Sequence, residues 1–369
     1  MHVARLEARD FRSHAVADIE FGDGITVLEG PVGAGKTNLL EAVHVGCMAR
    51  SFRTSNEREL IRFDTKVARV RLQVAAGGAL HTTEVVIQTT GPKVVRRDGS
   101  RVTNPPAGDP PLFVCVFAPD HLELVKGAAG GRRARLDDLV STVWPARRAA
   151  RASYAKALAQ RNALLGRVRA RAAAPDSLQV WDRELARHGI ELMAHRRELV
   201  DSLAAPFSRR AAELGLPAPA TLAYRPRSAA ADAAQLESEL RERLNSDLER
   251  GFTLHGPHRD DVQLRTASRD LRRYGSQGQQ RLGLLALLLA ERDVLRQTRD
   301  TTPVMLLDDV LSELDPDRRT SLLATLADGG QTLLSTADER TVPDSAQTTS
   351  VAVRPPAGDP LEVKAREIA

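Results

Sequence analysis

Residues 30–37, GPVGAGKT, combine glycine, lysine and threonine in a spacing that suits phosphate chemistry. They fit G-x-x-x-x-G-K-[ST] between an apolar run and a run with helical spacing, which is the context this motif requires. Gly30, Gly33 and Gly35 allow the backbone to wrap closely around phosphate groups. Lys36 is placed to reach the β- and γ-phosphates, and the Thr37 hydroxyl to coordinate Mg²⁺. The stretch therefore predicts a nucleotide-phosphate loop.

Two adjacent acids, Asp308 and Asp309, follow the apolar run VMLL at 304–307. A strand that ends in Asp308 would present its carboxylate beside the phosphate loop, where it can hold Mg²⁺ through water. Asp309 could polarise the attacking water as a general base. Two acids after an apolar strand are also compatible with a solvated strand end, but the phosphate loop favours the catalytic interpretation.

A second anion site is predicted at residues 274–281, YGSQGQQR, which open a long apolar run. Backbone N–H groups and the positive end of the helix dipole would point outward there. SELD at 312–315 and STAD at 335–338 follow. Each tetrapeptide is a weak signal alone, and the value of both lies in their order after the phosphate loop.

The net charge of +5 over 369 residues is unevenly distributed. Residues 132–171 contain 11 Arg or Lys and 2 Asp, a balance of +9. That balance indicates an acidic partner such as nucleic acid, and we expect Arg132, Arg133 and Arg135 to contact DNA. A solvated arginine-rich helix is the alternative interpretation.

We expect a cytoplasmic, nucleoid-associated protein without a membrane partner, and three features favour the cytoplasm. Cys47 and Cys115 give no disulfide framework, and the charged N-terminal residues lack the apolar core of a signal peptide. The longest apolar run, residues 282–290, is far shorter than a membrane span.

The elements that must position these residues follow from periodicity. Alternating residues 3–21 predict a hairpin, 25–29 a buried strand, 37–49 a helix, and 67–74, 81–88, 93–99 and 112–119 further strands. Residues 121–250 read as helices, 304–307 and 331–334 as strands, and the segment after 340 as a loosely ordered end with one or two edge strands. We therefore expect an α/β head from 1–120 and 251–369, with an inserted α-helical arm at 121–250.

The order of these motifs resembles that of the ATP-binding-cassette (ABC) ATPases, and YGSQGQQR resembles their signature motif. In that family the signature serine and glycine bind the γ-phosphate held by the phosphate loop of another copy. The fold class implied is an ABC-type P-loop ATPase head with an inserted helical arm. One chain would carry two half-sites, and an ATP-dependent homodimer would complete both.

Several blocks are also similar to the RecF family of bacterial recombination mediators, in the RecF order. They are DFRSH (10–14), GPVGAGKTNLLEAV, RSFRT (50–54), VFAPDHLELVKG with RRARLDD, GPHRDD (256–261), GSQGQQR and LLDDVLSELD. The resemblance implies ATP and Mg²⁺ as cofactors and slow hydrolysis that resets the dimer. It also implies binding to DNA at gaps or junctions and support of RecA loading in repair and replication restart, with RecR and indirectly RecO.

Carried over by position, Lys36, Asp308 and Asp309 are the catalytic residues, with Thr37 and Asp308 at the metal. The nucleotide contacts are Gly30, Gly33, Ala34, Gly35, Lys36, Thr37, Asn38 and Arg12 in one copy, and Ser276, Gly278 and Gln279 in the other. Asp315 belongs to the loop that crosses the dimer interface. The sequence departs from the family pattern at two places. Asp309 stands where transporter-type cassettes have glutamate, and Ser335 or Thr336 stands in the neighbourhood of the usual switch histidine, which is missing. His258 and Arg259 receive no role.

Four alternatives share some of these motifs. A transporter ATPase is disfavoured by the basic helical insertion between Lys36 and Ser276. A Rad50 or SMC head requires a far longer coiled coil, and a P-loop kinase or GTPase leaves YGSQGQQR unexplained. An ATP-gated DNA clamp, in which hydrolysis only resets the state, overlaps the favoured interpretation.

Overall fold

The computed structural model describes residues 1–102, 112–343, 346–354, 361–362 and 365–367. The chain forms two compact units. One, which we call the head unit, comprises Met1–His121, Glu213–Gly215 and Leu295–Ala369. The other, which we call the inserted unit, comprises Leu122–Ala212 and Leu216–Val294.

The head unit contains a seven-stranded sheet that starts from the expected hairpin. Its order is β15-β2-β1-β4-β5-β6-β7, and β1, β2, β4, β5, β6 and β7 pair antiparallel. Val3, Leu6 and Ala8 alternate with charged residues along β1 and are buried, which gives the sheet one apolar face. The strands are β1 (His2–Phe11), β2 (His14–Glu20), β4 (Val67–Ala76), β5 (Ala79–Gln88), β6 (Val94–Arg97), β7 (Ser100–Arg101) and β15 (Leu361–Glu362).

A second head sheet is mostly parallel and carries the predicted catalytic segments. Its order is β16-β14-β3-β13-β12-β8, and only β16 runs antiparallel to its neighbour. Every residue of β12 and β13 is buried, as expected for strands covered on both faces. The strands are β3 (Ile25–Glu29), β8 (Val114–Phe117), β12 (Val304–Asp308), β13 (Thr332–Thr336), β14 (Thr348–Ala352) and β16 (Ala365–Glu367).

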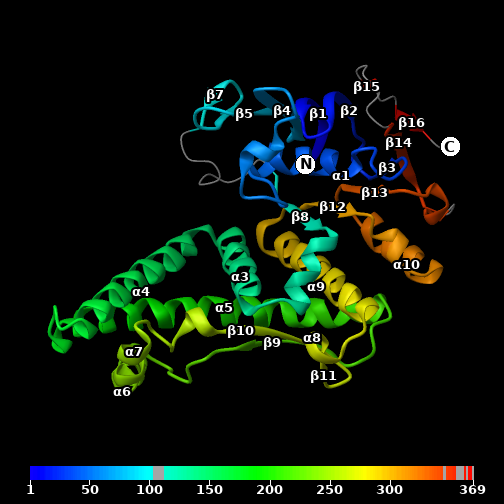
Figure 1. Ribbon diagram of the computed structural model, residues 1–369. Coiled ribbons are helices and arrows are strands. Elements are labelled where there is room, and N and C mark those ends of the chain that lie inside the picture. The colour runs from blue at the N-terminus through cyan, green and yellow to red at the C-terminus, as the bar shows by residue number, and fades with distance from the viewer. Residues whose placement is uncertain (103–111, 344–345, 355–360, 363–364, 368–369) are drawn as a thin grey trace. The chain divides into compact units, whose positions relative to one another are not determined.

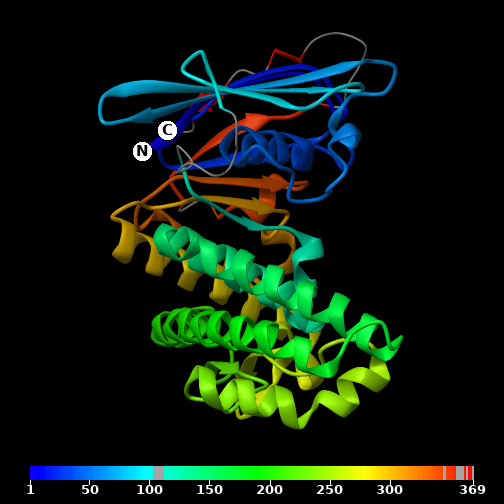
Figure 2. The same cartoon turned by 90° about the vertical axis from the view of Figure 1, so that its left-hand side faces the viewer.

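Helix α1 (Lys36–Met48) lies between the two head sheets, as Figure 2 shows. Helix α10 (Pro316–Ala327) connects β12 to β13, and short turns η1 (Glu57–Leu60), η6 (Leu311–Glu313) and η7 (Glu339–Thr341) complete the head. Strand β13 pairs with both β3 and β12. The carboxyl ends of these three strands therefore meet at one sheet edge, where ligands bind in open α/β sheets.

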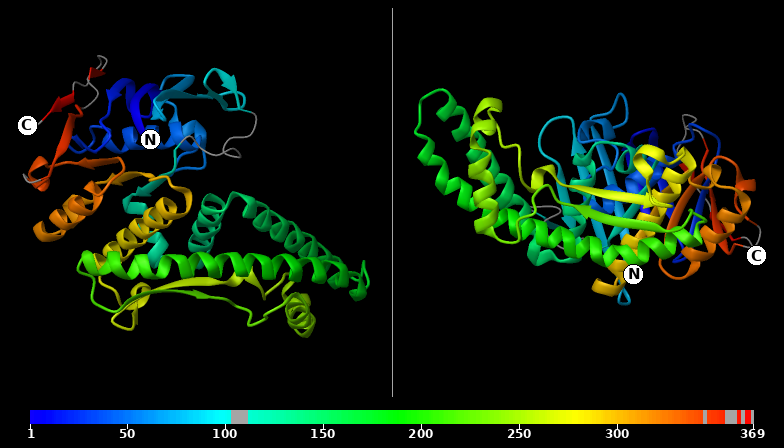
Figure 3. Two further views of the ribbon diagram at one scale, coloured as in Figure 1. Left: turned by 180° about the vertical axis from the view of Figure 1, so that it is seen from behind. Right: turned by 90° about the horizontal axis from the view of Figure 1, so that it is seen from below.

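The inserted unit consists of long helices and a short sheet (Figures 1 and 3). Helices α4 and α5 form the expected helical pair, with η4 (Pro175–Leu178) between them, and the antiparallel strands β9 and β10 run along α5. The helices are α2 (Glu123–Lys126), α3 (Ala129–Val143), α4 (Arg148–Arg169), α5 (Gln179–Glu213), α6 (Ala233–Glu242), α7 (Leu244–Arg250), α8 (Leu271–Tyr274) and α9 (Gln277–Arg299). The strands are β9 (Ala220–Arg225), β10 (Asp261–Thr266) and β11 (Arg269–Asp270), and the turns are η3 (Pro145–Arg147) and η5 (Pro257–Arg259). In turn η2 (Pro119–Leu122) the chain passes from the head unit to the inserted unit.

Three features differ from the sequence-based expectation. The inserted unit is not purely helical, because β9 pairs with β10 in full register. Residues 251–294 therefore belong to the inserted unit, whereas the expected division placed them in the head. The segment after residue 340 contains the expected edge strands, β15 and β16, but it also contributes an inner strand, β14, which pairs with both β3 and β16.

Across the residues that the structure describes, no helix combines the length and apolarity needed to cross a membrane.

Candidate nucleotide-binding site

The predicted phosphate loop connects β3 to α1 and has the backbone conformation that its glycines allow. Gly33 and Gly35 have φ values of 85° and 93°. A Cβ atom at Gly35 would lie 2.4 Å from His14 Nε2, so only glycine fits there. Ala34 is buried under the loop, and its N–H donates to the Pro31 carbonyl at 3.1 Å. The loop is therefore shaped by its neighbours as well as by its own residues.

Lys36, the first residue of α1, folds back over this loop. Its Nζ donates to the carbonyl oxygens of Gly30 at 2.7 Å and Pro31 at 2.9 Å. Burial lowers the pKa of Lys36, and the charges of Asp309 and Asp308 oppose that shift. The ammonium group thus sits within the loop, held by weak carbonyl acceptors that a phosphate oxygen can replace.

Thr37 and Asp308 meet at the carboxyl edge of the parallel sheet. Thr37 Oγ1 donates to Asp308 Oδ1 at 2.8 Å, and Ser335 Oγ donates to the same oxygen at 2.7 Å. Ser335 is the penultimate residue of β13 and pairs with Asp308 of β12, so its hydroxyl lies beside the carboxylate at the end of that strand. A hydroxyl and a carboxylate are hard oxygen ligands, and the pair fits Mg²⁺ bound together with nucleotide phosphates.

Asp309 adopts a left-handed backbone conformation, with φ 50°. Its backbone N–H donates to Ser335 Oγ at 3.0 Å, and its carboxylate Oδ1 is buried with no hydrogen-bond partner. Burial raises the pKa of Asp309 and the nearby Asp308 charge adds to the shift, whereas a hydrogen bond with Ser312 and the charge of Lys36 oppose it. A partly desolvated carboxylate with one unpartnered oxygen is suited to accept a proton from water.

Side chains of the turn between β1 and β2 form hydrogen bonds with the phosphate loop and with α1. The sequence analysis did not predict these contacts. His14 Nε2 lies 3.1 Å from the Gly35 carbonyl oxygen, and Asn38 Nδ2 donates to Ser13 Oγ at 2.8 Å. Burial lowers the pKa of His14, which favours the neutral ring. Asn38, expected to contact nucleotide, thus also links the helix to this turn.

Arg12 was also expected to contact nucleotide, and the structure pairs it with a buried acid on α1. Its Nε and Nη2 donate to the two carboxylate oxygens of Glu41 at 2.9 and 2.8 Å. Glu41 is fully buried and also accepts from Ser51 Oγ at 2.5 Å and Arg53 Nη1 at 3.2 Å. The blocks DFRSH, GKTNLLE and RSFRT therefore converge on one carboxylate. A charged residue inside the apolar run LLEAV was the signal that could have revealed it.

The predicted signature residues lie in the inserted unit, at the start of α9. Ser276 Oγ accepts from the Gln279 N–H at 3.2 Å, and Gln279 Oε1 accepts from the Ser276 N–H at 3.0 Å. This reciprocal pair is a capping box, which leaves the N–H groups of Gln277 and Gly278 without intrahelical acceptors. A Cβ atom at Gly278 would meet only Ser276 Oγ, at 4.0 Å. The loop is open to an anion.

Asp315, in the head, caps α10 by accepting from the Arg318 N–H at 3.0 Å.

The three arginines expected to contact DNA are engaged within the inserted unit. Arg132 is buried, and its Nε and Nη2 donate to Asp261 at 2.6 and 2.9 Å. Arg135 pairs with the buried Glu291, and Arg133 Nη1 donates to the Asp260 carbonyl at 2.7 Å. A buried guanidinium that already holds a carboxylate cannot also bind a phosphate. This placement contradicts the expectation for Arg132 and leaves Arg133 and Arg135 with internal roles.

His258, for which the sequence provided no role, belongs to an internal network. His258 Nδ1 lies 2.7 Å from Tyr154 Oη, and Nε2 lies 2.9 Å from the Thr253 carbonyl oxygen. A neutral ring satisfies both contacts, with Nδ1 accepting and Nε2–H donating. Burial lowers the pKa of His258 to about 4.

The fold and the site define a P-loop ATPase head of the kind shared by ABC-type ATPases and Smc proteins. Residues 5–105 match the AAA domain family. The Smc head domain from Pyrococcus furiosus superposes with a TM-score of 0.59 at 16% identity, covering 99% of this chain and 96% of that chain, which shows the fold alone.

More similar proteins identify the particular family. The DNA replication and repair protein RecF of Herpetosiphon aurantiacus is 36% identical over 362 residues, covering 92% of this chain and 94% of that protein. RecF of Acidothermus cellulolyticus is 38% identical, covering 93% and 96%. A solved structure of the recombination mediator protein RecF with ATP superposes with a TM-score of 0.85 at 27% identity, covering 100% and 98%. The chain belongs to the RecF family of DNA replication and repair proteins.

Proposed function

We propose that this chain is an ATP-dependent DNA-binding recombination mediator with weak, Mg²⁺-dependent ATPase activity. Two copies close around ATP, and the dimer binds DNA at gaps or at junctions of single- and double-stranded DNA. With RecR, and indirectly RecO, it supports the loading of RecA in repair and replication restart. Membership of the RecF family and the ATP-bound state of a solved relative support this proposal.

One observation carries it: the chain holds two incomplete halves of a nucleotide site. Thr37, Lys36 and Asp308 form a phosphate and metal site in the head unit. The capping box of Ser276 and Gln279 forms an open helix start in the inserted unit. An isologous dimer in which each signature faces the other copy's phosphate loop would complete two sites, so ATP would stabilise the dimer.

Hydrolysis would follow from the position of Asp309. With Mg²⁺ held by Thr37, Asp308 and the phosphates, the unpartnered Oδ1 of Asp309 would orient and deprotonate water. The Asp309 side chain is one methylene shorter than glutamate, which fits a slow hydrolysis that sets how long the dimer stays closed. Loss of the γ-phosphate would remove the group shared by both copies and reopen the dimer.

DNA would contact exposed basic residues of α4 and of the turn after it instead of Arg132. Lys156, Arg167 and Arg171 are exposed, and no described carboxylate pairs with them. Lys156 and Arg167 are eleven residues apart, about three helical turns, so they share one face of α4. A basic stripe without acids suits a phosphate backbone, which is contacted without regard to sequence.

The test compares oligomeric state and DNA binding of the full chain without nucleotide, with ATP and with ADP, all with Mg²⁺. Sedimentation should show dimers with ATP only, and fluorescence anisotropy should show tighter DNA binding in the same sample. Equal DNA affinity in all three states would contradict the proposal. A chain that binds DNA as an ATP dimer without detectable phosphate release would be a clamp and not an ATPase.

A further inference from the structure

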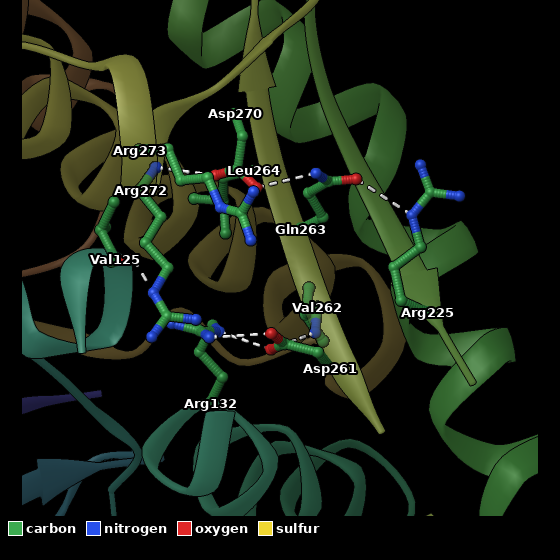
Figure 4. A pocket seen from close by; sticks show the side chains of 10 residues that line it. All are labelled: Val125, Arg132, Arg225, Asp261, Val262, Gln263, Leu264, Asp270, Arg272 and Arg273. Carbon is green, nitrogen blue, oxygen red and sulfur yellow. Dashed lines mark hydrogen bonds and ion pairs between the residues drawn. The ribbon is translucent and has the colours of Figure 1, made fainter. Parts of the chain in front are cut away.

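The inserted unit contains a basic pocket that the proposed nucleotide site does not use. It has a volume of about 340 Å³ and is lined by Val125, Arg132, Arg225, Asp261, Val262, Gln263, Leu264, Asp270, Arg272 and Arg273. Figure 4 shows its arginines entering from three elements: Arg132 from α3, Arg225 from β9, and Arg272 and Arg273 from α8. The volume lies at the lower end of the range for small-ligand pockets, roughly 300–1,000 Å³.

Both aspartates that line the pocket already accept hydrogen bonds from other residues of the protein. Asp261 accepts two hydrogen bonds from Arg132 and one from the Val262 N–H. Asp270 caps α8 through the Arg272 N–H at 2.8 Å and accepts from Gln263 Nε2 at 2.8 Å. Of the four arginines, only Arg132 is neutralised by a carboxylate.

The other three arginines have no acidic partner among the described residues. Arg225 Nε donates only to the neutral Gln263 Oε1, at 3.0 Å, and Arg272 Nε donates only to the Lys126 carbonyl, at 3.3 Å. Arg273 makes no described side-chain hydrogen bond or ion pair. All three are exposed, and four arginines against two aspartates give the lining a net charge of +2.

From this arrangement we infer that the pocket binds a phosphate group. Guanidinium groups bind oxyanions through paired N–H donors, and arginine is the preferred side chain for that geometry. A carboxylate offers two oxygens in one plane, whereas the tetrahedral phosphate offers oxygens in several directions. Arg225 of β9 and the arginines of α8 lie on opposite sides of the Gln263 side chain (Figure 4), so their donors are not in one plane, which favours phosphate. The group can be a free phosphate or a phosphate of DNA, and the two sources share this chemistry.

Phosphate bound there would restrain the chain directly before the signature residues. Arg272 and Arg273 belong to α8, which ends at Tyr274. The Gln280 side chain of α9 donates to the Leu271 carbonyl at 3.0 Å, so the start of α9 is tied to the same short helix. We therefore expect residues 271–281 to report occupancy of the pocket. This binding requires neither ATP nor a dimer, so it stands apart from the proposed function.

The experiment is hydrogen–deuterium exchange of residues 271–281 in the full chain carrying Lys36→Met, which removes the lysine of the other phosphate site. Inorganic phosphate and a short single-stranded oligonucleotide are titrated separately, at constant ionic strength set with chloride. The variant Arg273→Glu is compared with Arg269→Glu, a matched reversal on β11 outside the pocket. Circular dichroism checks that both variants are folded.

We expect slower exchange on addition of phosphate or oligonucleotide, with the apparent affinity at least tenfold weaker in Arg273→Glu and unchanged in Arg269→Glu. Protection by inorganic phosphate identifies a free-phosphate site. Protection by the oligonucleotide alone, lost when its backbone is an uncharged methylphosphonate, identifies a DNA phosphate. No protection by either ligand, or equal protection in Arg273→Glu, overturns the inference.

Discussion

The Thr37 hydroxyl donates a hydrogen bond to the Asp308 carboxylate at 2.8 Å, although the two residues are 271 positions apart in the chain. The contact arises because β3 and β12 flank β13, so that the residues after β3 and the end of β12 reach the same sheet edge. Both groups are expected Mg²⁺ ligands. A metal ion would replace the hydrogen bond between them without moving either strand.

Asp308 and Asp309 should therefore be separable by mutation. Asp309→Asn should lower the hydrolysis rate about 100-fold or more, the size of a general-base contribution, while ATP binding and dimerisation remain. Asp308→Asn should weaken Mg²⁺-dependent ATP binding as well, because the metal loses a charged ligand. Phosphate release and titration with a fluorescent ATP analogue measure the two effects. A normal rate in Asp309→Asn would show that the base lies elsewhere.

The conformation of the phosphate loop and the position of Asp308 at the end of a buried strand could be predicted because both depend on short, local patterns. The partners of Glu41 could not, because they come from three segments and meet only in the folded head. The same reason explains why Arg132 was expected to contact DNA although it forms an internal ion pair. A count of charges along the chain does not show that Asp261, 129 residues later, neutralises it. Strand β9 was missed because its six residues become a strand only through pairing with β10.

The Glu41 carboxylate should be essential for the stability of the head unit. Glu41→Gln leaves Arg12 and Arg53 without their buried counter-charge, and breaking a buried ion pair from one side costs about 3–5 kcal/mol. Hydrogen exchange of residues 36–60 in increasing urea would measure the loss. The control is Glu20→Gln, which alters a side chain that is 78% exposed. Equal stability of the two variants would contradict this role for Glu41.

Acid should destabilise the inserted unit through His258. Its pKa is about 4 in the folded chain, below the ordinary 6.5. Between these values the unfolded state binds a proton that the folded state does not, so stability falls as pH decreases from 6.5 towards 4. At pH 5 the loss should be on the order of 1–2 kcal/mol. The wild-type advantage in unfolding free energy over His258→Gln should be smaller at pH 5 than at pH 7. A difference that does not change with pH would contradict this prediction.

DNA affinity should depend on the exposed basic residues of α4 and the turn after it. Reversing Lys156, Arg167 and Arg171 to Glu should weaken binding to all sequences and reduce the slope of log K against log salt, because fewer counterions are released. Anisotropy titrations at several salt concentrations measure both quantities. Reversing the exposed Arg183, Arg187 and Arg197 of α5 is the matched control. If only the α5 reversal weakens binding, the contact surface lies on α5. Arg132→Glu is unsuitable, since it would place two carboxylates together in the unit's interior.

The shared nucleotide site can be tested with two defective chains. Lys36→Met removes the phosphate-loop lysine, and Ser276→Arg blocks the signature by filling the open start of α9. Each variant alone should be inactive, because every site of its homodimer carries one lesion. In a mixed dimer, the intact phosphate loop of the Ser276→Arg chain faces the intact signature of the Lys36→Met chain, while the opposite site carries both lesions.

With random pairing half of the dimers are mixed and half of their sites are intact. Roughly a quarter of the wild-type ATPase rate should therefore return on mixing if the two sites of the isologous dimer act independently. Coupling between the sites would lower this value, so two further measurements decide the question. The rate per chain should fall on dilution below the dimerisation range, and Ser276→Arg should not hydrolyse ATP. A dilution-independent rate, or normal turnover in Ser276→Arg, would place the whole site within one chain.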